Sequence, residues 1–339
     1  MARDGVRVGL LGCGRIGRMH AANLARHPRT TLAMVYDVRR PSAETVGAAE
    51  DAPVADSAEA VFDSDAVDAV LIATATETHA AYIEAAVAAG KPALCEKPID
   101  LSLARVNACA ERIGQGASRI QLGFNRRFDP GHRAARDAFR AGEIGDLHQL
   151  VITSRDPGMP SRAYYEQAGG LLRDMTIHDF DLARFMLPDE PVEVSAMVGR
   201  LNDPALMEEL DDHDTAMVLL RTASGVQGVI NNSRASTYGY DQRVELLGRR
   251  GMLLSGNRTA HGLRRYGGAA VEAAAPYLEF FIERYEAAFM AELDAFARCV
   301  ESGEPPEVGF EDGRRALILA EAAYRSAGEG RAVRVDEIT

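Results

Sequence analysis

The sequence predicts an α/β protein with two domains: a doubly wound parallel sheet in the N-terminal part, and an α/β domain with an open, mostly antiparallel sheet in the C-terminal part. Two observations carry this prediction. Up to residue 122, short apolar segments alternate with helical patterns, which is typical of a parallel sheet. Across residues 147–254, strand-like segments follow one another with turn residues between them. We therefore expect domains at residues 1–122 and 123–339.

The first predicted strand leads directly into a glycine motif. Residues 6–11 are apolar and β-branched, GCGRIG follows at residues 12–17, and a helical pattern covers residues 18–26. The glycines of such a motif allow a tight turn, a close approach of the backbone to a pyrophosphate and close packing of helix on strand. The helix N-terminus then faces the phosphates. This context predicts a Rossmann domain that binds a dinucleotide.

The second predicted strand indicates which dinucleotide is bound. It covers residues 31–36 and ends at Asp37, twenty residues after Gly17. A carboxylate there can accept both hydroxyls of the adenosine ribose and repel a 2′-phosphate, so NAD is favoured over NADP. Arg39 and Arg40 weaken this preference, because arginines just past this strand can accept a 2′-phosphate.

The rest of the N-terminal domain continues the alternation. Helices are expected at residues 43–49, 57–62, 80–89 and 103–112, and strands at residues 66–73, 93–95 and 120–123. Ligands of an open α/β sheet bind beyond the carboxyl ends of its strands. The polar loop 74–79 and the segment Glu96-Lys97-Pro98 both follow such ends, so we expect them on the same rim as the glycine motif. There Lys97 becomes a candidate catalytic group, although a lysine is more often a solvated surface charge.

The C-terminal domain is expected to open with a helix ending near residue 141. Strands are predicted at residues 147–154, 192–198, 215–221, 226–232, 243–247 and 251–254, closing helices at 278–302 and 311–327, and a loop at 268–275. Alternation of apolar and polar residues in 192–198 indicates a sheet with one face on a core and the other free for helices or a partner subunit.

A histidine between two acids marks a candidate site in this domain. A helix is predicted from the glycine pair at residues 169–170 to about residue 187, and it places Asp174, His178 and Asp181 at i, i+4 and i+7. A carboxylate one turn away can hold one imidazole nitrogen and stabilise the charged ring, which leaves the other nitrogen free for proton transfer. The alternative is a surface histidine with ordinary solvated acids.

Composition excludes several classes of protein. The formal net charge is −12 without a long basic block, which argues against nucleic acid as the main partner. The four cysteines form no C-x-x-C pair, and the His/Asp cluster supplies no convincing ligand set, so neither a disulfide framework nor a metal is expected. No apolar run reaches the length of about 18 residues that a membrane span needs. No signal peptide is recognisable, so we expect a cytoplasmic protein.

Several of these segments resemble a known family. GCGRIG at 12–17, CEKP at 95–98 and GFNRRFD at 123–129 are similar to landmarks of the glucose–fructose oxidoreductase / inositol dehydrogenase (Gfo/Idh/MocA) family. RDMTIHDFD at 173–181, TSRDP at 153–157 and TYGYDQ at 237–242 resemble its inositol 2-dehydrogenase branch. The resemblance covers essentially the whole chain. It implies a Rossmann domain joined to an α/β domain whose open sheet mediates oligomer contacts, commonly in homotetramers.

The resemblance also implies roles for individual residues. It implies that His178 takes the hydroxyl proton, Lys97 hydrogen-bonds the reacting oxygen, and Asp174 orients both and stabilises positive charge. Together with the glycine motif and Asp37, the expected cofactor contacts are Gly12, Gly14, Arg15, Ile16, Gly17, Asp37, Thr74, Thr76, His79, Glu96 and Lys97. The expected substrate contacts are Asn125, Arg126, Asp156 and Tyr240.

The function expected from this resemblance is NAD-dependent oxidation of a cyclic polyol. The first candidate is myo-inositol, which would give 2-keto-myo-inositol (scyllo-inosose) and NADH. Another inositol isomer, an aminocyclitol or an aldose stays open, because the positions of Asn125 and Ser154 vary between inositol dehydrogenases. A dinucleotide-binding regulator without turnover is the third alternative. A non-catalytic member is expected to lose Lys97 or His178, and both are present.

Overall fold

The computed structural model describes residues 5–268 and 270–338, and these form two compact units. The first unit takes in the described residues up to Phe128 together with Ala287–Leu317. The second takes in Asp129–Glu286 and the described residues from Ile318 onward. The contact units therefore differ from the expected division at 122/123 chiefly in the segment 287–317, which returns to the first unit. The assignment of functions to residues 1–122 and 123–339 stays a prediction.

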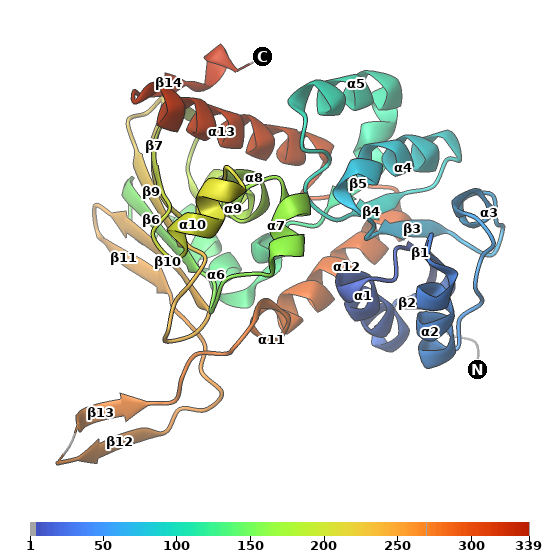
Figure 1. Cartoon of the computed structure of the whole chain (residues 1–339), viewed down its shortest axis with the longest axis horizontal. Helices are drawn as coiled ribbons and strands as arrows, with labels where there is room; N and C mark the ends of the chain where they lie inside the picture. The colour runs from blue at the N-terminus through green and yellow to red at the C-terminus, as the bar shows by residue number, and fades with distance from the viewer. Residues whose placement is uncertain (1–4, 269, 339) are drawn as a thin grey trace. The chain divides into compact units, whose positions relative to one another are not determined.

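The first unit contains the predicted parallel sheet, and its strands are ordered β2-β1-β3-β4-β5 (Figure 1). All neighbouring strands in it run parallel. The strands are β1 (Val6–Leu11), β2 (Thr30–Tyr36), β3 (Ala69–Ile72), β4 (Ala93–Cys95) and β5 (Ile120–Leu122). The order reverses between β1 and β3, which is the switch point where open α/β sheets bind their ligands.

Helices connect these strands in the predicted alternation. They are α1 (Arg15–Arg26), α2 (Arg40–Glu50), α3 (Ala58–Phe62), α4 (Thr76–Ala88) and α5 (Leu103–Ile113), with short 3-10 helices η1 (Gly114–Arg119) and η2 (Asn125–Phe128). Serine side chains begin two of them: Ser57 accepts a hydrogen bond from the backbone N–H of Ala60 and Ser102 from that of Arg105. These caps satisfy backbone donors that the first turn of a helix leaves without partners.

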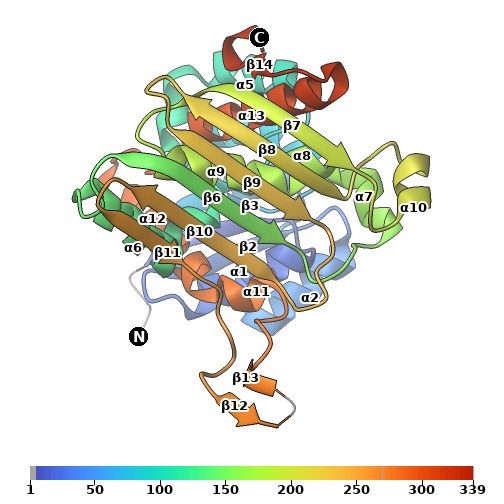
Figure 2. The ribbon, with the colours of Figure 1, turned by 90° about the vertical axis from the view of Figure 1, so that its left-hand side faces the viewer.

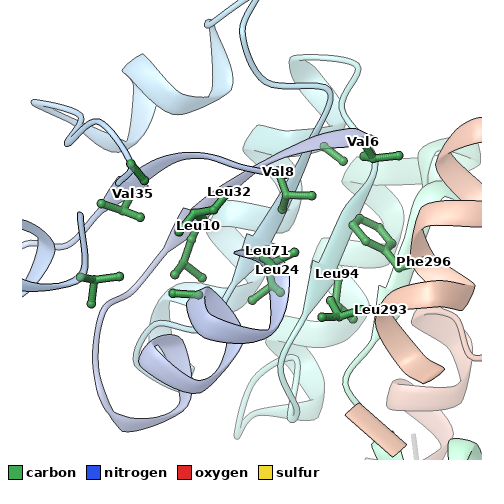
Figure 3. Close-up of a cluster of buried hydrophobic side chains, with 14 of the residues drawn as sticks. Val6, Val8, Leu10, Leu24, Leu32, Val35, Leu71, Leu94, Leu293 and Phe296 are labelled. Carbon is green, nitrogen blue, oxygen red and sulfur yellow. The ribbon is translucent and has the colours of Figure 1, made fainter. Parts of the chain in front are cut away.

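A buried cluster explains why the segment 287–317 belongs to the first unit. Leu293 and Phe296, on α12 (Glu286–Ser302), lie in the same cluster as Leu10, Leu71 and Leu94 of the parallel sheet (Figure 3). All five side chains are at most 1% exposed. Burial of each such side chain contributes about 1.5–3 kcal/mol relative to exposure. The following helix, α13 (Phe310–Glu329), has residues in both units.

The second unit contains the predicted open sheet, with the strand order β11-β10-β6-β9-β8-β7-β14 (Figure 2). β6 and β9 run parallel, and every other neighbouring pair described is antiparallel. The strands are β6 (Leu147–Arg155), β7 (Pro191–Gly199), β8 (Thr215–Thr222), β9 (Gln227–Ser233), β10 (Asp241–Gly248), β11 (Gly251–Ser255) and β14 (Val333–Arg334). The prediction of a mostly antiparallel open sheet is confirmed.

The two faces of this sheet differ in burial. Along β8, Val218 is fully buried, whereas Met217 and Leu219 on the other face are each 58% exposed. Met217 lies opposite Met197 of β7, which is 77% exposed. Helix α9 (Thr176–Met186) lies against β6 and β9, and the face turned towards the viewer in Figure 2 is largely uncovered by helices.

The second unit contains further helices, of which α7, α10 and η3 were not predicted. The full set is α6 (Pro130–Arg140), α7 (Arg162–Ala168), α8 (Leu171–Asp174), α10 (Pro204–Glu209), α11 (Phe281–Arg284) and the 3-10 helix η3 (Val335–Glu337). The short helices α7 and α10 were missed because two turns or fewer show no periodicity. The predicted helix at 278–302 is interrupted between α11 and α12. No helix in the described ranges is long and apolar enough to cross a membrane.

Two further expectations need correction. The predicted loop at 268–275 was wrong, because strands β12 (Arg264–Gly267) and β13 (Ala270–Ala274) form a separate hairpin there (Figure 1). Exposed strands without a buried face carry no alternation that a sequence pattern could reveal. The helix predicted to run to residue 187 is interrupted at Met175, where the N–H of His178 bonds the carbonyl of Met175 three residues earlier.

Candidate active site

The parallel sheet aligns the segments that were expected to hold the cofactor. Leu11, at the end of β1, lies in register with Tyr36 of β2 and Ile72 of β3, and Ile72 lies in register with Cys95 of β4. Cys95 is in turn paired with Leu122 of β5. All five strands therefore end at one level, and the residues that follow them lie along one rim of the sheet.

The glycine motif occupies the switch point of this rim. Gly12 has φ +95°, and a Cβ on it would lie 2.4 Å from the carbonyl oxygen of Ala73. A Cβ on Gly17 would lie 1.9 Å from the carbonyl oxygen of Gly12. Both positions therefore require glycine. Gly14 is different, because a Cβ there would meet nothing within 4 Å. The space beside Gly14 is therefore open, so that a pyrophosphate can approach the backbone closely at this residue.

The first turn of α1 follows the motif and completes it. Gly14 is the N-cap of this helix, Arg15 at its start is exposed, and Ile16 is partly exposed. The free N–H groups at a helix N-terminus favour an anion such as a pyrophosphate.

Asp37 is held directly beside the glycine motif. Its carboxylate accepts hydrogen bonds from the backbone N–H of Cys13 at 2.7 Å and of Arg39 at 2.8 Å. These two bonds fix the carboxylate at the end of β2, where a bound adenosine ribose is expected. The guanidinium of Arg40 lies 2.7 Å from the carboxylate of Asp56 in an exposed ion pair. Exposed pairs of this kind are weak, so Arg40 stays available to a 2′-phosphate.

His79 ties the predicted nicotinamide loop to the lysine segment. Its Nδ1 lies 2.7 Å from the carbonyl oxygen of Pro98, and its Nε2 lies 3.1 Å from the carbonyl oxygen of Thr74. The ring is 2% exposed, and burial lowers the pKa of His79. A neutral ring donates to only one of the two carbonyls. His79 therefore links the backbone at Thr74 to the backbone at Pro98. The peptide bond between Lys97 and Pro98 is cis, and Thr76 begins α4.

Glu96, which precedes the candidate catalytic lysine, has a partner that the sequence did not reveal. His20 Nε2 on α1 lies 2.7 Å from Glu96 Oε1. Burial raises the pKa of Glu96, but the hydrogen bond and charge of His20, with the charge of Lys97, outweigh burial and lower it overall. A partly buried anion therefore lies next to Lys97 in the chain. Asn125 and Arg126, on η2 after β5, are 4% and 5% exposed.

In the second unit, Asp174 ends α8 and is held by two donors. The hydroxyl of Tyr164 lies 2.9 Å from each of its carboxylate oxygens, and Nη2 of Arg234 lies 2.7 Å from Oδ2. Nη1 of the same arginine lies 3.4 Å from Oδ2 of Asp156, which follows β6. Sequence reasoning identified the two acids and missed the arginine and the tyrosine. No local pattern marks them, because they reach Asp174 from other segments of the chain.

Two other predicted site residues, His178 and Tyr240, also belong to the second unit. His178, on α9, is partly exposed, as a proton-transferring ring needs to be. Tyr240 is 5% exposed, and its ring lies 6.2 Å from that of Tyr285 and 6.5 Å from that of Phe280, measured between centroids. Lys97 belongs to the first unit, so its joint action with Asp174 and His178 stays a prediction.

In the described part of the chain, no group of three or more His, Cys, Asp or Glu side chains is arranged to hold a metal ion. That the reaction needs no metal stays a prediction.

Comparison with known families identifies the chain. Residues 6–124 match the profile described as oxidoreductase family, NAD-binding Rossmann fold, and residues 132–254 match the GFO/IDH/MocA C-terminal domain. The chain belongs to the GFO/IDH/MocA family. The resemblance expected from the sequence motifs is thereby confirmed, as is the NAD-binding Rossmann fold.

Relatives of this family member match it over nearly its full length. Inositol 2-dehydrogenase of Rhizobium meliloti (strain 1021) is 42% identical, with 97% of this chain and 99% of the relative covered. Myo-inositol 2-dehydrogenase of Thermotoga maritima is 41% identical, with 98% and 99% covered. The crystal structure of a myo-inositol dehydrogenase from Corynebacterium glutamicum has 44% identity and a TM-score of 0.94, with 97% and 98% covered.

Two solved structures of lower sequence identity contain ligands. A myo-inositol dehydrogenase from Lactobacillus casei, in complex with NAD(H) and myo-inositol, is 25% identical with a TM-score of 0.86 over 97% of this chain and 96% of that chain. A scyllo-inositol dehydrogenase from the same organism, with NAD(H) and scyllo-inositol, is 26% identical with a TM-score of 0.90 over 98% and 99%.

Proposed function

We propose that the protein is an NAD-dependent dehydrogenase that oxidises myo-inositol to 2-keto-myo-inositol (scyllo-inosose) and releases NADH. The observation that carries the proposal is the joint presence of Lys97, Asp174 and His178 in a chain that is about two-fifths identical to inositol 2-dehydrogenases over nearly their whole length. Its first unit supports NAD binding through the glycine motif and the fixed carboxylate of Asp37.

The chemistry divides between the cofactor and the chain. NAD, when bound, accepts the hydride that leaves the carbinol carbon. His178 takes the proton of the same hydroxyl group, so that the carbon–oxygen bond becomes a carbonyl. Lys97 donates a hydrogen bond to the reacting oxygen and stabilises the negative charge that develops on it. Asp174 stabilises the positive charge that His178 acquires.

The expected substrate contacts offer side chains that can hydrogen-bond the hydroxyl groups of a polyol. Asn125 and Arg126 supply an amide and a guanidinium, and Asp156 and Tyr240 supply a carboxylate and a phenol, all suited to hydroxyl groups. A ring bearing a hydroxyl on every carbon makes use of several such partners at once. This match supports a cyclic polyol as the substrate.

A second candidate is an inositol of different stereochemistry. A scyllo-inositol 2-dehydrogenase (NAD(+)) from Bacillus subtilis is 35% identical over 98% of this chain and 96% of the relative. An aminocyclitol or an aldose is a further alternative. A regulator without turnover has less support, because Lys97, Asp174 and His178 are all retained.

We also propose that the protein forms a homotetramer through the open sheet of its second unit. The support is a set of large apolar side chains on strands of that sheet, which are exposed in the single chain: Met197, Met217, Leu219, Met252 and Leu254. Met197 and Met217 lie opposite each other on β7 and β8, and exposed apolar side chains on a sheet face uncovered by helices are typical of protein interfaces. The mass measured by light scattering after size-exclusion chromatography tests this, and a monomer at micromolar concentration would contradict it.

The experiment that tests the activity follows NADH absorbance with a panel of substrates: myo-inositol, scyllo-inositol, glucose and xylose. We expect the highest kcat/KM with myo-inositol and NAD. In the same assay, His178→Ala should lower kcat by about 10²–10⁴, because a general base contributes that much. A folded His178→Ala enzyme that binds NAD and keeps more than half its kcat would contradict the mechanism. Absence of turnover with every polyol would contradict the function itself.

A further inference from the structure

Arg234 is a charged residue whose side chain is buried in the second unit. It follows β9 directly and is 3% exposed. Its backbone N–H donates to the carbonyl oxygen of Asp214 at 2.8 Å, which fixes the start of the side chain. A buried guanidinium is costly unless it is paired. The groups that pair with this one are Asp174 at 2.7 Å and Asp156 at 3.4 Å.

We propose that Arg234 is a positioning residue for the dehydrogenase reaction, which holds the carboxylates of Asp174 and Asp156 in their working orientations. The inference rests on the proposed function, because that function gives the two carboxylates their roles. The guanidinium suits this task since its donors point in fixed directions from one plane, so that Nη1 and Nη2 reach different acids. The flexible ammonium of a lysine has no such fork.

Tyr164 and Tyr165, both on α7, complete the arrangement. The hydroxyl of Tyr164 donates to Asp174, and burial followed by the charge of Asp174 raises the pKa of Tyr164 well above its usual value. This phenol therefore stays a donor throughout the pH range of activity. The ring of Tyr165 lies with its centroid 5.6 Å from Cζ of Arg234, within the range of a cation–π contact. Asp174 is thus held from two sides by donors that do not lose their protons.

Other acids near this cluster have their own partners. Oδ1 of Asp212 accepts from the backbone N–H of Leu171 at 3.0 Å. The carboxylate of Asp214 accepts from the backbone N–H groups of Leu201 and Asn202, each at 2.8 Å. Backbone donors therefore stabilise these two anions. Within residues 5–268 and 270–338, the ion pairs of Arg234 are those with Asp174 and Asp156.

Removing the arginine has a predictable effect on pH dependence. Without its charge, the buried carboxylate of Asp174 and the partly exposed carboxylate of Asp156 lose their common counter-ion, and each favours the uptake of a proton. Protonated Asp174 can no longer stabilise positive charge on His178. An ionised Asp174 without Arg234 would instead hold the proton on His178 more firmly. Either change removes the active form at low pH, so the acid limb of the kcat/KM profile moves to higher pH in both cases.

The experiment compares Arg234→Met, Arg234→Lys and Arg184→Met in the holoenzyme. Arg184 is the matched control: its side chain is 8% exposed, it lies on α9 in the same unit, and it pairs with Glu190 at 2.7 Å and Asp181 at 3.9 Å, neither of which has a role in the proposed reaction. We expect Arg234→Met to lower kcat about 10²-fold, since a misplacement of about 1 Å has that effect, and to shift the acid limb to higher pH. Arg234→Lys should restore the acid limb and part of kcat. Arg184→Met should lower thermal stability and leave kcat and the pH profile unchanged.

The outcomes separate the inference from the function. If wild-type enzyme oxidises no polyol, the proposed function fails. The inference is then decided by a crystal structure of Arg234→Met, in which unchanged Asp174 and Asp156 side chains would overturn it. If wild-type enzyme is active, a folded Arg234→Met with wild-type kcat and acid limb overturns it. Should Arg234→Met not fold, Arg234→Lys decides the inference, because it keeps the positive charge and removes the planar fork that reaches both acids. A wild-type kcat in folded Arg234→Lys would then overturn the inference.

Discussion

Replacing glycines of the 12–17 motif by alanine separates folding from cofactor binding. In Gly17→Ala the new methyl would lie 1.9 Å from the carbonyl oxygen of Gly12, a backbone atom. Contacts between non-bonded heavy atoms are favourable at about 3.5–4.0 Å, so α1 must shift by roughly 1.5 Å. In Gly14→Ala the methyl meets nothing within 4 Å, and φ of −72° suits alanine.

The expected magnitudes follow from these contacts. Alanine in a helix gains up to about 1 kcal/mol over glycine, whereas overpacking costs about 1–3 kcal/mol. Because the obstacle at Gly17 is backbone and cannot rotate away, we take the upper cost, for a net loss of about 2 kcal/mol. For a unit of this size that lowers Tm by about 4–8 °C. In Gly14→Ala, Tm should change little, while the methyl stands between the backbone and the pyrophosphate and weakens NAD binding at least about tenfold.

Two measurements on both variants decide the matter: Tm of the apo-protein by calorimetry, and Kd for NAD by isothermal titration. We expect Gly17→Ala to lose both stability and affinity, and Gly14→Ala to lose affinity alone. Wild-type affinity in Gly14→Ala would show that the pyrophosphate does not pass over this residue. An unchanged Tm in Gly17→Ala would refute the steric reasoning.

Three further predictions follow from the structure. Asp37→Ala should narrow the preference for NAD over NADP with help from Arg39 and Arg40, and a wild-type kcat/KM that is higher with NADP would contradict the role of Asp37. Exhaustive chelation should leave activity intact, and activity lost and then restored by zinc would point to a metal-dependent enzyme. Burial and the charge of Glu96 raise the pKa of the fully buried Glu292 well above 4.5. The protonated carboxyl group of Glu292 therefore favours the folded state, and this contribution to stability declines as pH rises above 4.5. Glu292→Gln should gain stability relative to wild type with increasing pH, and a pH-independent difference in unfolding free energy would contradict this.

Elements with strong local patterns were predicted well. The run at residues 6–11 forms β1, and the glycine motif forms the turn into α1, because apolar β-branched residues and glycines restrict the backbone by themselves. The hairpin of β12 and β13 was missed because its strands have no buried face. The interruption at Met175 was missed because apolar spacing continues across it.

The sequence by itself determined the features that depend on local patterns, whereas only the tertiary structure decided which distant residues pair. Local patterns alone predicted the parallel sheet, the glycine motif and Asp37 at the end of its strand. The pairing of Asp174 with His178 was inferred from the spacing of a single helix, which is interrupted at Met175, and it stays a prediction. The sequence could not indicate that Arg234, 60 residues away, pairs with Asp174, or that His20, 76 residues away, pairs with Glu96. Periodicity and propensity depend on near neighbours in the chain, whereas a buried charge finds its partner through the packing of distant segments.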